Sequence, residues 1–529
     1  MTARGVSVLI GFVVLLAAVF LGVVLGGAST AQVRDDPWSH VPKRNAPVDH
    51  AAFFEGEFED GPAVTRRCLE CHPSAAEEVM KTSHWTWAGE VAVDPRTDEP
   101  IQIGKRNLQN NFCIAIAANW PRCTPCHVGY GWRKEGFLET ATPDRVDCLV
   151  CHDQSNQYQK APTKAGEPAD GVDLLAVAKS VGPTTRANCG TCHFKGGGGD
   201  GVKHGDLDET MYFPQERVDV HMGKHGLVCS DCHRTSHHQI RGRLLPPDTA
   251  EDTRVNCTDC HSEAPHHEDR LNSHVRTLAC QTCHIPTFAV ETGTKMWWDW
   301  SLAGEKGDPH EIAERLTLEI AADPSAEDRY PAEVLALIRR VDDDPDVWTH
   351  YDRKKGLFVI ARRLVPEYRW YDRRTKRYLP GERVEEDGPV HINLPLGEAE
   401  DPEAKIWPFK VHRGRQPIDL EHRHLLYPHV FGKGGYWKTF DWEEAFRAGA
   451  EASGVPYSGR HGWVESEMFW PQNHMVQAKE KALRCADCHG PEGRMDWTAL
   501  GYPGDPAVQG DRRQMDIVRD RRPVYGETR

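Results

Sequence analysis

The longest apolar stretch of the chain lies at its N-terminus. Residues 6 to 27 contain no charged side chain and follow Arg4. This length is sufficient to span a bilayer and exceeds the apolar region of an ordinary signal peptide. Small residues from Ser29 to Ala31 also fit a signal-peptidase site. Residues 1 to 31 are therefore either a signal peptide or an N-terminal membrane anchor. Both interpretations predict a periplasmic protein, soluble or anchored to the inner membrane.

The pattern after this segment is short and interrupted. Residues 32 to 66 are polar, contain several prolines and lack periodicity, which predicts an extended arm. Between residues 67 and 290 the helical patterns are brief, as at residues 74 to 81 and 174 to 181. Glycine and proline turns separate them. Side chains alone give such a segment little core.

Residues 291 to 470 have a different character. Two amphipathic, charged stretches between residues 310 and 340 predict surface helices. Apolar and polar residues then alternate around a basic turn from residue 356 to 381, which predicts a β-hairpin. Residues 475 to 483 look helical again, at the start of a C-terminal segment from residue 471 to 529. The expected fold is mainly α with much irregular structure and a small β-hairpin.

Cysteine spacing gives the first chemical signal. Of 17 cysteines, 16 form eight copies of Cys-x-x-Cys followed directly by His. Zinc ribbons and disulfide frameworks also use paired cysteines, but neither requires a histidine after each second cysteine. The full motif attaches haem c: two thiols bind the porphyrin and the histidine binds the iron. The copies are Cys68, Cys71 and His72; Cys123, Cys126 and His127; Cys148, Cys151 and His152; Cys189, Cys192 and His193; Cys229, Cys232 and His233; Cys257, Cys260 and His261; Cys280, Cys283 and His284; and Cys485, Cys488 and His489.

Composition agrees with a chain that packs around cofactors. Only 39% of the 529 residues are hydrophobic, and eight covalently attached haems would supply the missing apolar surface. Seven motifs fall between residues 67 and 290, too close together for a separate domain around each. We therefore expect a multihaem cytochrome c fold organised around a packed array of eight haems. The formal net charge of −15 argues against a nucleic-acid partner.

Histidines outside the motifs are candidates for the opposite axial position on each iron. There are 28 histidines, and the motifs use eight. Those that lie just before a motif, or on a helix after one, are favoured over their neighbours His237 and His266. For each, a surface or core histidine is the alternative interpretation. The favoured set is His84, His221, His225, His238, His267, His274 and His474.

Seven histidines leave one of the eight irons without a second ligand. Two sequence features outside the motifs and the favoured histidines are candidates for a role at this iron. Cys113 is the single cysteine outside a motif. The stretch from Lys195 to His204 contains five glycines, whose backbone can approach a flat surface closely. A flexible surface loop is the alternative for the second feature.

Residues 110 to 132 (NNFCIAIAANWPRCTPCHVGYGW) and 189 to 208 (CGTCHFKGGGGDGVKHGDLD) resemble the octahaem tetrathionate reductase family of c-type cytochromes. This family is related to hydroxylamine oxidoreductases and multihaem nitrite reductases. The resemblance covers about residues 66 to 305 and 405 to 505. Residues 305 to 350 have no counterpart in it.

The resemblance implies that the haem on the second motif, at Cys123, is the active site. It implies Lys203 as the unusual distal ligand, with Cys113, Asp200 and Asn110 lining the pocket. A lysine binds iron only as the neutral amine, so burial must lower its pKa. Asp200 would hold the released ammonium or pass a proton to a reduced product.

The resulting hypothesis is an electron-fed reductase of small oxyanions. The family implies tetrathionate, with nitrite and hydroxylamine as further substrates, and an electron-donor cytochrome or quinol-linked redox protein as partner. A Cys113 thiolate could attack an S–S bond, although a free buried cysteine is often only a small apolar group. The alternative is a periplasmic electron conduit in which strong ligands close all eight irons. A hydroxylamine oxidase is less favoured, since no tyrosine stands out for cross-linking to a haem.

Overall fold

The computed structural model describes residues 36–44, 46–111, 114–195, 199–242, 254–385 and 388–508. The predicted signal peptide or anchor lies outside these ranges. Within them, no helix is long and apolar enough to cross a membrane. The chain divides into two units, Met1–Val41 with Cys257–Pro265, and Pro42–Asn256 with His266–Arg529. The predicted boundaries near residues 67, 291 and 471 stay predictions.

The first unit contains the sixth haem motif. Its described part consists of two 3₁₀ turns, η1 (Pro37–His40) and η9 (Cys257–Asp259). Asp36 caps η1 by accepting a hydrogen bond from the Trp38 amide. The second unit holds the other seven motifs and the sheet.

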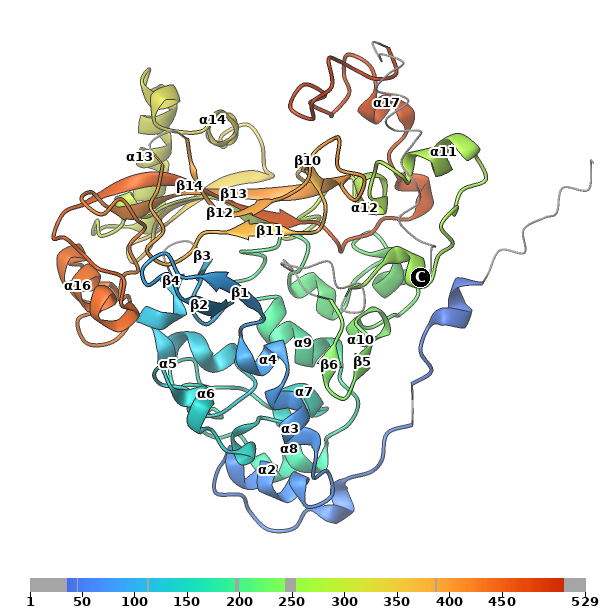
Figure 1. Cartoon of the computed structure of the whole chain (residues 1–529), viewed down its shortest axis with the longest axis vertical. Helices are drawn as coiled ribbons and strands as arrows, with labels where there is room; N and C mark the ends of the chain where they lie inside the picture. The colour runs from blue at the N-terminus through green and yellow to red at the C-terminus, as the bar shows by residue number, and fades with distance from the viewer. Residues whose placement is uncertain are drawn as a thin grey trace, which may run out of the picture. The chain divides into compact units, whose positions relative to one another are not determined.

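An eight-stranded sheet is the largest regular element of the second unit (Figure 1). Its order is β11-β12-β14-β13-β7-β9-β8, and β10 pairs with β13. The longest pairing joins β13 and β14, antiparallel from Phe409 opposite Pro471 to Asp419 opposite His461. The strands are β7 (Thr294–Asp299), β8 (Val347–Asp352), β9 (Gly356–Ala361), β10 (Glu367–Tyr371), β11 (Thr375–Arg377), β12 (Val390–Pro395), β13 (Lys405–Asp419) and β14 (His461–Pro471).

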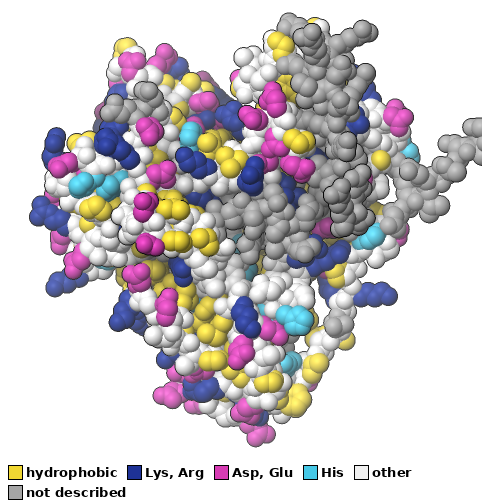
Figure 2. Space-filling view, viewed as in Figure 1, with side chains coloured by type: hydrophobic (Ala, Val, Ile, Leu, Met, Phe, Trp, Pro, Cys, Tyr) yellow, Lys and Arg dark blue, Asp and Glu magenta, His cyan; other side chains and the backbone are white. Residues whose placement is uncertain are grey.

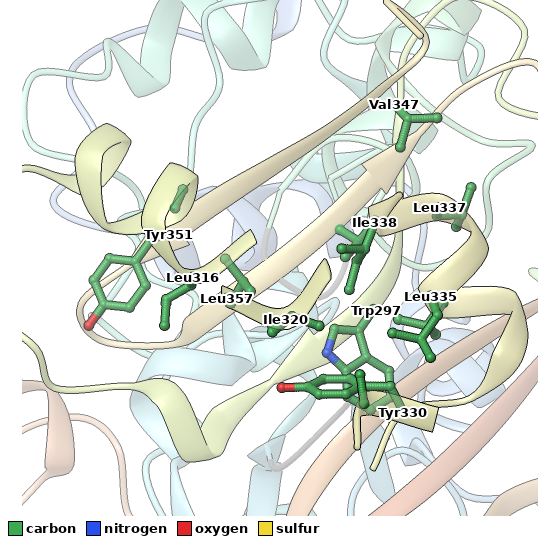
Figure 3. Packing of buried hydrophobic residues seen from close by; sticks show 14 of the residues in the cluster. Trp297, Leu316, Ile320, Tyr330, Leu335, Leu337, Ile338, Val347, Tyr351 and Leu357 are labelled. Carbon is green, nitrogen blue, oxygen red and sulfur yellow. The ribbon is translucent and has the colours of Figure 1, made fainter. Parts of the chain in front are cut away.

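The alternation of side chains along these strands builds two cores. Successive residues of a strand point to opposite faces. Trp297 and Leu357 therefore join the core under α13 (Pro309–Ala322) and α14 (Ala332–Ile338), where the rings of Trp297 and Tyr330 lie 5.6 Å apart (Figure 3). Trp298 and Phe358 join the core on the other face. The helices predicted between residues 310 and 340 are thus present and cover one face of the sheet.

The extent of this sheet corrects the predicted fold class. Helix accounts for 31% and strand for 18% of the structure, so the fold is not simply α with a small hairpin. The predicted hairpin at residues 356 to 381 is wrong: β9 pairs with β7 and β8, β10 with β13, and β11 with β12. The hairpin is instead β8–β9. Partners distant in sequence decided these pairings, and local alternation does not identify them.

The remaining helices and two-stranded ribbons include those that carry the haem motifs. On the sides of the sheet seen in Figure 1, α5, α7, α9 and α10 lie below it and α13 and α14 above it. The helices are α2 (Gly61–Leu69), α3 (Ala75–Met80), α4 (Ser83–Thr86), α5 (Trp120–Cys123), α6 (Phe137–Thr140), α7 (Leu149–His152), α8 (Leu174–Lys179), α9 (Arg186–His193), α10 (Cys229–Cys232), α11 (Asp269–His274), α12 (Cys280–His284), α15 (Tyr436–Thr439), α16 (Trp442–Ser453) and α17 (Cys485–Cys488). The two-stranded ribbons are β1 (Glu90–Val93) with β2 (Pro100–Ile103), β3 (Gln109–Asn111) with β4 (Ile114–Ala115), and β5 (Thr235–Ser236) with β6 (Gln239–Ile240).

The helix predicted at residues 475 to 483 is replaced by loop and one 3₁₀ turn, Lys479–Lys481. Met475 has φ of 63°, which an α-helix cannot contain. The Gln477 side chain donates to the carbonyl oxygens of Arg217 and Val218, which ties this loop to a distant segment. On the face seen in Figure 2, acidic and basic side chains are mixed, as on an ordinary solvated surface.

Candidate haem-binding and active site

Several motif histidines are oriented for metal binding by a hydrogen bond from Nδ1. Their Nδ1 atoms contact backbone or carboxylate oxygens, and Nε2 is left for a metal. This is the orientation that a ligand histidine usually has. The bonds join His152 to the Gly182 carbonyl oxygen at 2.9 Å, His233 to the Arg241 carbonyl oxygen at 2.8 Å, and His489 to Asp505 Oδ1 at 2.6 Å.

Five motif histidines face a second histidine from outside the motifs. Two imidazoles bound on opposite sides of one metal, each through a bond of about 2.0–2.1 Å, have ring centres roughly 6.3 Å apart. The observed distances fit this value, and the residues present therefore fit a bound haem iron. The ring-centre distances are 6.5 Å for His72 and His50, 6.2 Å for His193 and His84, 6.2 Å for His233 and His474, 6.2 Å for His284 and His266, and 6.5 Å for His489 and His274.

Two of these five partners are absent from the sequence prediction. His50 lies in the arm to which no chemistry was assigned, and its Nδ1 contacts the Val48 carbonyl oxygen at 2.9 Å. His266 takes the place predicted for His267, because the Asn272 side chain bonds both backbone groups of His266 at 2.9 Å. Sequence spacing contains no signal that separates these adjacent histidines.

The structure gives less information on the ligand role of the other favoured histidines. His238 Nδ1 contacts Glu78 Oε2 at 2.8 Å. Burial lowers the pKa of His152, and the nearby charge of His238 adds to this effect. His237 and His238 have φ of 47° and 60°, which makes the β5–β6 connection a tight hairpin turn. His225 and His267 are exposed and His221 is half-buried, and their ligation stays a prediction.

Cysteine contacts show which motifs are neighbours. Cys192 Sγ lies 3.9 Å from the Cys126 carbonyl oxygen, and the side chains of these two cysteines are neighbours. The side chains of Cys189 and Cys229 are neighbours as well. The fourth motif therefore touches both the second and the fifth. In the same way the side chain of Cys68 in the first motif lies beside that of Cys148 in the third.

The second motif differs from the others. His127 is 1% exposed and lies among aromatic rings, with ring-centre distances of 4.6 Å to Trp132, 4.9 Å to Trp85 and 5.2 Å to Trp87. Its Nε2 donates to the Trp85 carbonyl oxygen at 2.7 Å, and Nδ1 has no partner among the residues that the structure describes. Burial lowers the pKa of His127 to about 3. A buried neutral ring fits a metal ligand, although here the hydrogen bond engages Nε2, the nitrogen that His152, His233 and His489 leave for a metal.

A buried polar network supports the backbone of this motif. The Lys160 ammonium contacts Asp147 Oδ2 at 2.9 Å and donates to the His127 carbonyl oxygen at 2.5 Å. The hydroxyl groups of Tyr130 and Tyr158 donate to the two oxygens of Asp147 at 2.7 and 2.8 Å. Lys160, Tyr130 and Tyr158 thus all contact the Asp147 carboxylate, and Lys160 also holds the backbone of His127. Sequence inspection did not identify these groups.

Lys203 lies at the second motif. It is 7% exposed, and burial lowers its pKa to about 7. The positive charge of Lys105 lowers it further, while Cys126 and Cys123 oppose the shift, which places the amine near both thiols of the motif. At this pKa a large fraction of the amine is neutral near neutral pH.

Two sheet residues hold the backbone just before Lys203. The Thr294 hydroxyl on β7 donates to the Gly201 carbonyl oxygen at 2.5 Å. The side-chain nitrogen of Lys410 on β13 donates to the Val202 carbonyl oxygen at 2.8 Å. The side chain of His204 packs against Trp470, with the two ring centres 4.8 Å apart. The sheet thus fixes the backbone that carries Lys203.

The other predicted pocket residues are placed only in part. Asp200 accepts a hydrogen bond from the Glu209 amide at 2.7 Å, and burial raises its pKa. Its predicted role beside Lys203 stays a prediction. Asn110 belongs to β3, but its side chain, like all of Cys113, lies outside the described residues.

Comparisons with known proteins agree with this geometry. Residues 295–492 match a family model described as "Cytochrome c bacterial", and residues 67–153 match "Cytochrome c554 and c-prime". No curated protein gives a match. The crystal structure of octaheme cytochrome c from Shewanella oneidensis is 40% identical, with a TM-score of 0.74 over 87% of this chain and 98% of that chain. The protein therefore belongs to the octahaem c-type cytochrome family.

Proposed function

We infer that the protein binds haem c covalently and has a multihaem redox or electron-transfer function, as its family membership implies. We propose that the protein is a periplasmic reductase with eight haems that passes electrons to a Lys203-ligated second haem. The substrates are the oxyanions tetrathionate, in the first place, and nitrite, together with the uncharged molecule hydroxylamine. The donor is a cytochrome or a quinol-linked redox protein. The observation that carries this proposal is the burial of Lys203 beside Cys123 and Cys126.

The contrast between this site and the others supports a reductase. Five motif histidines face a histidine at a distance that fits two strong ligands on one iron. At the second motif the buried group near the two cysteines is the amine of Lys203, and its role as the second ligand is part of the proposal. Haem supplies the redox chemistry when bound, and the protein keeps Lys203 buried, so that its neutral form is available as a ligand that substrate can displace.

Motif contacts support delivery of electrons to this site. The fourth motif touches the second through Cys192 and Cys126, and the fifth through Cys189 and Cys229. The His474 ring pairs with His233 of the fifth motif. Asn473, its neighbour, accepts a hydrogen bond at 3.1 Å from Gln281 within the seventh motif. This series of contacts joins motifs that are far apart in sequence.

The proposal is tested with fully reduced, purified holoprotein. We expect added nitrite, hydroxylamine or tetrathionate to reoxidise all haem bands together, because contacts between motifs allow electrons to redistribute. The measurement is visible absorbance after rapid mixing. A conduit gives the opposite result: every haem stays reduced with all three compounds, while a partner cytochrome still reoxidises the protein. That result would remove the reductase proposal.

The proposed ligand assignments predict different effects for two adjacent histidines. We expect His266→Ala to leave the seventh haem with one axial ligand and to convert one low-spin haem to a high-spin or water-ligated form. His267→Ala is the matched control, because its side chain is exposed and should leave the spectrum unchanged. Low-temperature electron paramagnetic resonance measures both. The reverse pattern would return the assignment to His267.

A further inference from the structure

A second lysine, Lys105, is built into the surroundings of the second motif. It lies in the turn after β2, where the amides of Asn107 and Leu108 bond the Gly104 carbonyl oxygen at 3.2 and 2.9 Å. A Cβ atom on Gly104 would lie 2.3 Å from the Trp87 carbonyl oxygen, so only glycine permits this approach. The Arg106 amide donates to that same oxygen at 3.1 Å. The turn is thereby fixed against Trp87.

The side chain of Lys105 points toward the motif. Its Nζ lies 4.0 Å from the centre of the Trp87 ring, and that ring lies 5.2 Å from the ring of His127. The charge of Lys105 acts on Cys123 and on the amine of Lys203. It also acts on Cys126, His193 and His84, so the ammonium lies near both the second and the fourth motif.

Among the residues that the structure describes, this ammonium has an aromatic contact but no counter-charge. Within the described ranges, no carboxylate forms an ion pair with Lys105. A cation–π contact orients an ammonium without neutralising it. Lys105 thus brings a positive charge to the site where Lys203 lies, and a positively charged site attracts anions.

We propose that Lys105 is an anion-binding residue that, together with Lys203, holds a small oxyanion at the second haem. This inference rests on the proposed function and specifies its substrate class by charge. Nitrite and tetrathionate are anions, whereas hydroxylamine is uncharged near neutral pH. Lys105 therefore favours the first two and contributes nothing electrostatic to the third. A haem propionate is the competing occupant for the same ammonium.

The test compares steady-state kinetics of full-length holoprotein carrying Lys105→Met or Lys105→Arg with a reduced dye as donor. We expect Lys105→Met to raise KM for nitrite and tetrathionate about tenfold or more, with kcat little changed and KM for hydroxylamine unaltered. Lys105→Arg should retain most anion affinity. Lys164→Met, which removes an exposed lysine paired with Asp170, is the control for loss of one positive charge.

An equal loss with all three substrates overturns the proposal and indicates a propionate contact or a packing role. Added salt gives a second readout: it should raise KM for nitrite in the wild type and have little effect in Lys105→Met. If the wild type turns over none of the substrates, the proposed function fails, and the anion site is then tested by titrating oxidised holoprotein with nitrite. A dissociation constant about tenfold weaker in Lys105→Met supports the site, and an unchanged constant overturns it.

Discussion

Lys203→His is expected to lower the rate of substrate-driven reoxidation by about 100-fold or more. An imidazole remains a strong neutral ligand at pH 7, whereas a buried amine with a pKa near 7 leaves the metal more readily. The sheet keeps the backbone at this position in place, since Thr294 and Lys410 bond the carbonyl oxygens of Gly201 and Val202. The replacement therefore changes the ligand without releasing the loop.

Spectroscopy identifies the ligand independently of activity. Lys203→Ala should lose one lysine-type signal at low temperature and keep the histidine-ligated haems. Two controls come from the same loop. Lys195→Ala removes an exposed lysine paired with Glu209, and His204→Ala removes the neighbouring ring. An unchanged signal in Lys203→Ala, with loss of a bis-histidine haem in His204→Ala, would transfer the ligand role to His204.

Asp147→Ala should destabilise the protein by about 3–5 kcal/mol, because it leaves the buried Lys160 ammonium without a counter-charge. The variant also removes the acceptor for the hydroxyl groups of Tyr130 and Tyr158. The side chains of Asp147 and Lys160 are 0% and 4% exposed, so water does not replace the lost partner. Guanidinium unfolding followed by circular dichroism measures the change.

A nearby carboxylate provides the control for this prediction. Asp144 pairs with Arg66, whose side chain is 55% exposed, and Asp144→Ala should cost about 0–1 kcal/mol. Adding Lys160→Met to Asp147→Ala should restore part of the loss, since no unpaired charge then remains buried. Equal stabilities for Asp147→Ala and Asp144→Ala would mean that the network does not support the second motif.

The predictions that the structure confirms depend on local sequence. The helices near residues 310 to 340 form where apolar residues recur at helical spacing, and Asp308 caps the first of them through the amides of His310 and Glu311. The attachment motifs are local in the same sense, because both thiols and the histidine lie within five residues. No distant partner is needed to recognise either feature.

The sequence by itself determined the haem motifs and the two amphipathic helices, and a family resemblance implied a ligand role for Lys203 that stays a prediction. Only the tertiary structure decided which histidine faces which motif, as His474 facing His233 shows. It also decided the large sheet, whose strands pair across long loops, and the positions of Lys105 and Asp147 beside the second motif. The physical reason is range: helix periodicity and covalent attachment act over a few residues, whereas axial pairing, strand partners and buried charge networks join segments that approach one another only when the chain folds.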